Sequence, residues 1–88
     1  MMTPKDKVKK EIKKYLDSIG AYHFWPIQTG RSKRTIDCLC FCCGRGYGFE
    51  VKPEGVDGTP EQDKIIGGML QKGAHWAGYV QSAKDLPI

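Results

Sequence analysis

TIDCLCFCCGRGYGFEVK, residues 35–52, is the stretch around which the rest of the chain is organised. It predicts two strands joined by a glycine-rich turn, with Asp37 at the start of the first strand. Glu50 and Lys52 share one face of the second strand and lie roughly 6.5 Å apart along it. An acid and a base are costly inside an apolar run unless they are compensated, so we expect chemistry at this place.

The length of 88 residues predicts a single domain over residues 1–88. A chain this short buries only about 60–70% of its extended surface, and such a small core favours a homodimer. There is no apolar run of about 18 residues, so we expect no membrane span. The lysine-rich start is not followed by an apolar signal core, and we therefore expect a cytoplasmic protein.

Charge is unevenly distributed along the chain. Residues 1–34 hold nine Lys and Arg residues against three acids, whereas residues 35–88 hold five against seven. A basic surface beside an acidic pocket suits a polyanionic substrate that is cut with a metal ion. The alternative is that the lysine-rich helix is only a solvated face. The candidates for DNA binding are Lys7, Lys10, Lys14, Arg31, Lys33 and Arg34.

The four cysteines, Cys38, Cys40, Cys42 and Cys43, lie within six residues. Neighbours on an extended strand cannot form a disulfide without breaking the strand. No second group of cysteines exists that would complete a zinc site. We therefore expect reduced cysteines that pack as small apolar residues.

Capping residues and apolar spacing predict two helices. Thr3 caps the first helix, which ends at Gly20. Thr59 caps the second helix, which ends at Lys72–Gly73. Strands are predicted at residues 21–27, 37–43, 47–52 and 75–80, followed by a short turn or helix at 82–86. The predicted fold class is α/β in the order αβββαβ, a central mixed sheet flanked by helices.

The turn between the two central strands decides whether the acids meet. A two-residue turn at Gly44–Arg45 places all three polar side chains on one face. Asp37 then lies diagonal to Glu50 and opposite Lys52. A three-residue turn at 44–46 puts Asp37 on the other face, so this interpretation requires an even loop or a bulge.

Asp37 and Glu50 are candidate ligands of Mg²⁺ or Mn²⁺, because these ions prefer carboxylate oxygens and keep several waters. The backbone carbonyl of Val51 is a further candidate ligand. A divalent cation generates hydroxide and stabilises developing charge during phosphodiester hydrolysis. Lys52 is the candidate group that holds the attacking water and stabilises the charge of the phosphate.

The order of these residues resembles that of the PD-(D/E)XK nucleases, most closely the VRR-NUC (virus-type replication-repair nuclease) branch. The features that carry the resemblance are Glu11 on the first helix, Asp37, Glu50-Val51-Lys52, and Gln62 at the start of the second helix. The resemblance covers residues 8–86 and implies a restriction-endonuclease-like core. Two departures concern the loop: Ile36 stands where the family usually has Pro, and the nearest preceding glycine is Gly30.

The resemblance implies metal-dependent DNA cleavage and a role for each matched residue. Asp37 and Glu50 are implied as metal ligands, and Lys52 as the catalytic lysine. Glu11 is implied as an added acid that holds the metal or a water, and Gln62 as a residue near the metal.

Two of these residues have simpler interpretations. Glu11 is suitably spaced for an ion pair with Lys7 or Lys14, worth a few tenths of a kcal/mol. Gln62 completes a capping box with Thr59. A side chain that caps a helix can also lie near a metal, so the two interpretations of Gln62 are compatible.

Stand-alone members of this branch resemble small phage or bacterial Holliday-junction resolvases that act as homodimers. Two symmetric cuts in a four-way junction need two active sites. We therefore expect a metal-dependent, structure-specific DNA endonuclease that acts on four-way junctions, encoded by a phage or bacterium. The alternatives are a nuclease acting on flaps or other branched DNA, and a non-catalytic nucleic-acid-binding or assembly module.

Overall fold

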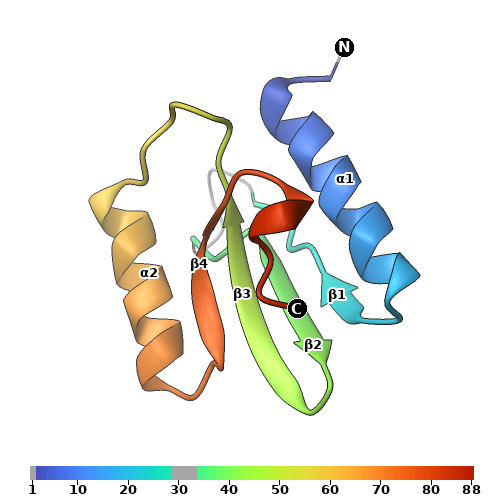
Figure 1. The fold of residues 1–88 in the computed structure, drawn as a ribbon. Coiled ribbons are helices and arrows are strands. Elements are labelled where there is room, and N and C mark those ends of the chain that lie inside the picture. Colours follow the sequence, from blue (N-terminus) through green and yellow to red (C-terminus); the bar gives the residue numbers. More distant parts are fainter. Residues whose placement is uncertain (1, 29–33) are drawn as a thin grey trace.

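A four-stranded sheet with one long helix on each face forms the body of the molecule (Figure 1). The computed structural model describes residues 2–28 and 34–88. The elements in chain order are α1 (Pro4–Ser18), β1 (Tyr22–Phe24), β2 (Cys38–Cys42), β3 (Arg45–Val51), α2 (Pro60–Gln71), β4 (Trp76–Val80) and the 3₁₀ helix η1 (Ala83–Asp85). This arrangement confirms the predicted α/β fold class and the order αβββαβ.

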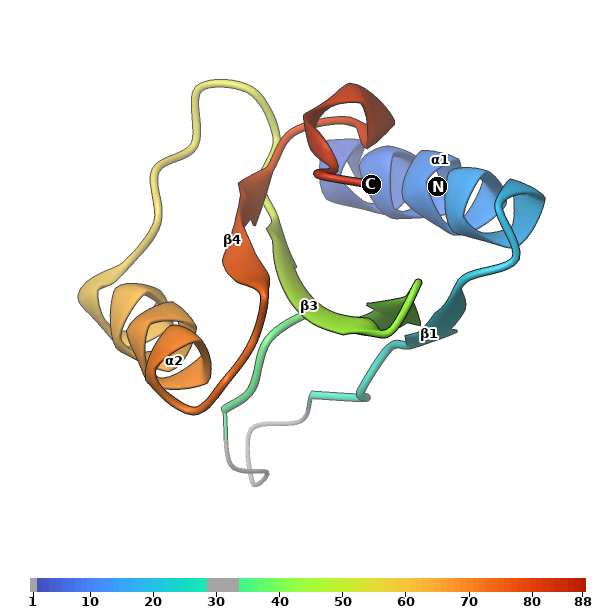
Figure 2. The ribbon, with the colours of Figure 1, turned by 60° about the horizontal axis from the view of Figure 1, so that its bottom comes forward.

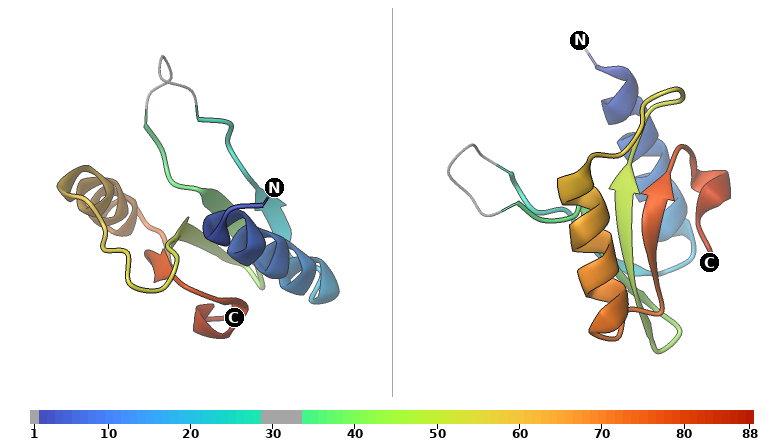
Figure 3. Two further views of the ribbon diagram at one scale, coloured as in Figure 1. Left: turned by 90° about the horizontal axis from the view of Figure 1, so that it is seen from above. Right: turned by 90° about the vertical axis from the view of Figure 1, so that its left-hand side faces the viewer.

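The sheet is mixed and has the strand order β1-β2-β3-β4. Strand β2 runs antiparallel to both of its neighbours, β1 and β3, and β4 runs parallel to β3. Antiparallel neighbours can be joined by a short turn, whereas a parallel pair needs a long crossover. Here α2 provides that crossover, and it lies on the face opposite α1 (Figures 2 and 3).

Both helices begin where the sequence predicts. Thr3 and Thr59 are the N-caps, and each forms a capping box with the residue three positions later, Asp6 and Gln62. Each cap thereby satisfies backbone amides that have no partner within the helix. Within residues 2–28 and 34–88, no helix combines the length and the apolar character needed to cross a membrane.

The hydrophobic core lies between α1 and the sheet. Ile12 and Leu16 on α1 are fully buried, as are Cys38, Phe49 and Val51 on the central strands. Alternate residues of β2 and β3 point to this face, as the period of a strand requires. Residue 50, whose neighbours Phe49 and Val51 face the core, therefore points to the side of the sheet that α2 partly covers.

The face of the sheet toward α2 is closely packed at Gly48. A Cβ added to Gly48 would lie 2.7 Å from Sδ of Met69 and 2.9 Å from Cδ1 of Ile36. The missing side chain at this position lets α2 and the chain before β2 approach β3.

The turn between β2 and β3 differs from the prediction. Cys42 pairs with Arg45, so the two-residue turn consists of Cys43–Gly44 rather than Gly44–Arg45. Both turn residues have positive φ, 57° for Cys43 and 78° for Gly44, as a type I′ hairpin turn requires. The predicted turn and the observed turn both contain two residues. The register therefore stays even, and residues 37 and 50 still share a face. It also places them directly opposite each other, so the predicted opposition of Asp37 to Lys52 is wrong.

Only two of the cysteines are part of the core. Cys38 and Cys40 are fully buried, and burial raises the pKa of their thiols to about 12 and about 11. Cys42 is half-buried and Cys43 is exposed at the hairpin tip, with their sulfurs 3.2 Å apart. The prediction that all four are packing residues is therefore wrong for Cys43, because that residue lies in the turn.

Substitutions in the turn test its position. Cys43→Asn should stabilise the protein, because Asn adopts positive φ more readily than Cys, and Gly44→Ala should destabilise it by about 1–2 kcal/mol. Cys42→Asn is the matched control and should be destabilising, since Asn is disfavoured in strands. Urea denaturation measures all three. A loss of stability in Cys43→Asn would contradict the assigned turn.

Candidate active site

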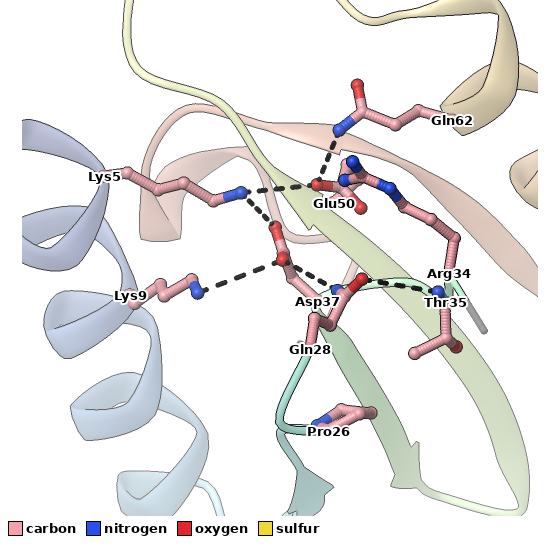
Figure 4. A pocket seen from close by; sticks show the side chains of 9 residues that line it. All are labelled: Lys5, Lys9, Pro26, Gln28, Arg34, Thr35, Asp37, Glu50 and Gln62. Carbon is pink, nitrogen blue, oxygen red and sulfur yellow. Dashed lines mark hydrogen bonds and ion pairs between the residues drawn. The ribbon is translucent and has the colours of Figure 1, made fainter. Parts of the chain in front are cut away.

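A polar pocket of about 240 Å³ opens between α1, the ends of β2 and β3, and α2 (Figure 4). Its lining combines two acids, three bases and two amides. The lining residues are Lys5, Lys9, Pro26, Gln28, Arg34, Thr35, Asp37, Glu50 and Gln62. The pocket therefore gathers residues from five separate parts of the chain.

Asp37 and Glu50 form the centre of the pocket. Asp37 directly precedes β2 and Glu50 is the penultimate residue of β3, and the register places them opposite each other. Their exposed fractions are only 5% and 4%. The amide of Val51 donates a hydrogen bond of 2.9 Å to Oδ2 of Asp37, which fixes this carboxylate against the neighbouring strand.

Two lysines of α1 reach the acids. Nζ of Lys5 lies 2.9 Å from Oδ2 of Asp37 and 3.5 Å from Oε2 of Glu50. Nζ of Lys9 lies 3.9 Å from Oδ1 of Asp37. The ammonium of Lys5 thus bridges the two carboxylates, and Figure 4 shows it pointing between them.

Gln62 connects the pocket to α2. Its Oε1 accepts a hydrogen bond of 3.0 Å from the amide of Thr59, which is the capping interaction. Its Nε2 donates a hydrogen bond of 3.2 Å to Oε2 of Glu50. One side chain therefore both caps the helix and holds a carboxylate of the pocket.

The two acids titrate differently. Burial and the neighbouring Asp37 raise the pKa of Glu50 to about 7, against the opposing effect of Lys5. Burial also acts to raise the pKa of Asp37. Hydrogen bonds with Glu50, Lys5 and the Val51 amide outweigh burial, so the pKa of Asp37 lies below its usual value.

The structure does not bring Glu11 to this pocket. Its Oε1 accepts a hydrogen bond of 3.2 Å from the amide of Ala83, at the start of η1. Lys5 and Lys9 occupy the side of α1 that faces the acids, and residues two positions apart do not share a helix face. The predicted place of Glu11 beside the metal ligands is thus taken by lysines, and its predicted pairing with Lys7 or Lys14 is not observed.

Lys52 lies beyond the end of β3 and does not line the pocket. It is buried, and its backbone amide donates to the carbonyl of Val80 at 3.0 Å. Val51, whose carbonyl is the candidate ligand, is the last residue of β3 and is fully buried. Lys52 therefore remains a predicted catalytic residue. It is close to Glu50 in the sequence, but it does not line the pocket.

The basic candidates for DNA binding are divided among different places. Lys7, Lys10 and Lys14 are exposed on α1, outside the pocket lining. Arg34 lines the pocket, and its Nε lies 3.4 Å from Oε1 of Glu61. The remaining two candidates, Arg31 and Lys33, lie outside the described residues.

The residues predicted from the sequence do not include five that line the pocket: Lys5, Lys9, Pro26, Gln28 and Thr35. Lys5 and Lys9 continue the spacing of the buried Ile12 and Leu16 toward the start of α1, and this spacing was the available signal. Gln28 donates a weak hydrogen bond of 3.5 Å to Asp37. Its contribution depends on the path of a loop, which no local pattern predicts.

Comparisons with known proteins give one informative match. No protein-family model matches the chain, and no curated protein matches it in sequence. A solved structure described as a "VRR_NUC domain" matches 94% of this chain with 89% of its own length, at a TM-score of 0.76 and 26% sequence identity. The match confirms the resemblance that the sequence predicts.

The pH dependence of stability tests the raised pKa of Glu50. The ordinary pKa is 4.5 and the folded value is about 7, so folding favours the protonated form. This contribution is complete below the unfolded pKa and is lost as pH rises through the folded pKa. In metal-free protein, the melting temperature of wild type minus that of Glu50→Gln should decrease as the pH rises from about 5 to about 8. A relative melting temperature that is constant or rises over this range would contradict the assignment.

Proposed function

The chain has the fold of a VRR_NUC domain over nearly its whole length, and on this premise we propose that it is a nuclease of the PD-(D/E)XK type. The proposed reaction is metal-dependent hydrolysis of phosphodiester bonds in branched DNA. The observation that carries the proposal is the pair Asp37 and Glu50, buried opposite each other at the base of a polar pocket. Buried acids that do not stabilise a core are expected at functional sites.

The donor set fits a hard divalent cation such as Mg²⁺ or Mn²⁺. Asp37 and Glu50 offer carboxylate oxygens, and the carbonyl of Val51 is the proposed additional ligand. Among residues 2–28 and 34–88, no group of three or more His, Cys, Asp or Glu side chains gathers as a metal cluster. Two carboxylates suffice for Mg²⁺, which keeps several of its waters. When bound, the ion supplies a hydroxide nucleophile and stabilises charge on the phosphate.

The chain's own residues position the acids and the substrate in this proposal. Gln62 holds Oε2 of Glu50, and the Val51 amide holds Oδ2 of Asp37, so both carboxylates are oriented before substrate arrives. Lys52 is the proposed catalytic lysine, which stabilises charge on the phosphate. Glu11 has no part in the proposed site, because its carboxylate binds the start of η1.

The proposed substrate is a four-way DNA junction. The exposed lysines of α1 (Lys7, Lys10 and Lys14) lie on the helix that also contributes to the pocket, and a basic surface of this kind binds the phosphate backbone without reading sequence. Resolution of a junction needs two cuts, so we propose a homodimer with one active site in each subunit. Each active site would hydrolyse one phosphodiester bond in one strand of the junction.

A non-catalytic nucleic-acid-binding module is the second candidate. It is favoured by the ion pairs of Lys5, which neutralise charge in the pocket without a metal. It is also favoured by the position of Lys52 outside the pocket lining. Activity separates the two candidates directly.

Cleavage of a labelled four-way junction by purified protein tests the proposal. We expect cleavage products in Mn²⁺ or Mg²⁺ and none in EDTA. We expect Glu50→Ala to cleave at least about 100-fold more slowly than wild type, because a proposed metal ligand is gone. Linear duplex, nicked and flap substrates measured in parallel define the preference. Binding without cleavage in every divalent metal would leave only the non-catalytic candidate.

Lys52→Ala tests the role of the lysine separately. If Lys52 acts on the phosphate, this variant should keep Mn²⁺ binding and junction binding but lose cleavage. Calorimetry and gel-shift assays measure the two binding steps, and circular dichroism checks the fold because Lys52 is buried. Full cleavage by Lys52→Ala, or loss of its metal binding, would contradict the proposed role.

A further inference from the structure

Lys5 occupies the position at which the two acids of the pocket converge. We propose that Lys5 is a built-in counter-ion, which compensates Asp37 and Glu50 in the metal-free protein and must leave when a divalent cation binds. The inference rests on the proposed function, since it concerns the same metal ligands. It assigns to Lys5 a role in setting the affinity of those ligands for the metal.

The geometry supports direct competition. The Lys5 ammonium lies 2.9 Å from Asp37 and 3.5 Å from Glu50, so it contacts an oxygen of each carboxylate. A cation held by both acids would lie between the same two carboxylates and would meet the ammonium of Lys5 there.

The two partners differ in their freedom to move. The acids are almost fully buried and are held by Val51 and Gln62, whereas the Lys5 side chain is 33% exposed. Lys5 also lies in the first turn of α1. A long, flexible side chain with access to solvent can therefore withdraw while the acids stay in place.

Electrostatics determine the consequence for metal affinity. Two buried carboxylates need a compensating charge, and Lys5 provides it when no metal is present. A divalent cation must overcome this ion pair and the repulsion from Lys9, whose ammonium lies 3.9 Å from Asp37. The free protein should therefore bind metal more weakly than the same acids would without Lys5.

The alternative is that Lys5 only stabilises the fold. In that case its substitution would lower stability and leave metal affinity unchanged or reduced. Competition predicts the opposite sign for metal affinity. Measurement of affinity in the absence of DNA thus separates the two roles without relying on catalytic activity.

The experiment is calorimetric titration of Mn²⁺ into wild type, Lys5→Gln and Lys5→Glu. Lys5→Gln removes the competing charge, and Lys5→Glu also adds a carboxylate near the site. We expect tighter binding in both, by at least about tenfold in Lys5→Glu, because a change of two charge units acts on a doubly charged ion about 4 Å away. Lys64→Glu is the control: it makes the same charge change at an exposed position of α2 outside the pocket lining, and should change affinity by less than about twofold.

A second measurement keeps the test valid if a variant is less stable. Without metal, Lys5→Gln should melt at a lower temperature than wild type, because two buried acids lose their counter-ion. Saturating Mn²⁺ should raise the melting temperature of Lys5→Gln more than that of wild type, since ligand binding stabilises the folded state. An equal or smaller rise in Lys5→Gln would overturn the inference.

The remaining outcomes distinguish this inference from the proposed function. If wild type binds Mn²⁺, Glu50→Ala does not, and the Lys5 variants bind like wild type, the metal site stands and competition by Lys5 is wrong. If wild type and all variants fail to bind Mn²⁺, both the metal site and the inference are wrong.

Discussion

Two carboxylates buried opposite each other across the β2–β3 hairpin, Asp37 and Glu50, are the constraint on which the site depends. Like charges at such a place are unfavourable, and three parts of the chain compensate them. α1 contributes Lys5, α2 contributes Gln62, and β3 contributes an amide of its own backbone. The two helices on opposite faces of the sheet thus meet at one pocket, and the raised pKa of Glu50 is the remaining cost of this arrangement.

The geometry of the pair follows from the hairpin turn. A two-residue turn keeps an even register, and an even register places residues 37 and 50 on the same face of the sheet. The turn at Cys43–Gly44 makes them direct rather than diagonal neighbours. Their separation from the apolar core is a consequence of the same alternation, because the residues on either side of Glu50 face α1. A one-residue change in loop length would move Asp37 to the other face.

Much of the fold could be predicted from local signals, whereas parts of the site could not. The capping residues Thr3 and Thr59 located both helices, and strand alternation brought Asp37 and Glu50 to one face. The turn position was missed because positive φ at a cysteine has no sequence signal. The place of Glu11 depends on η1, which follows it by 72 residues, and no local pattern predicts such a contact.

The proposed binding of a divalent cation by Asp37 and Glu50, in place of Lys5, can be observed directly in crystals grown with Mn²⁺ and measured for its anomalous signal. We expect an anomalous peak in contact with both carboxylates and a Lys5 ammonium that has moved away from them. A protein that shows Mn²⁺ only elsewhere, with Lys5 still bridging the two acids, would contradict it.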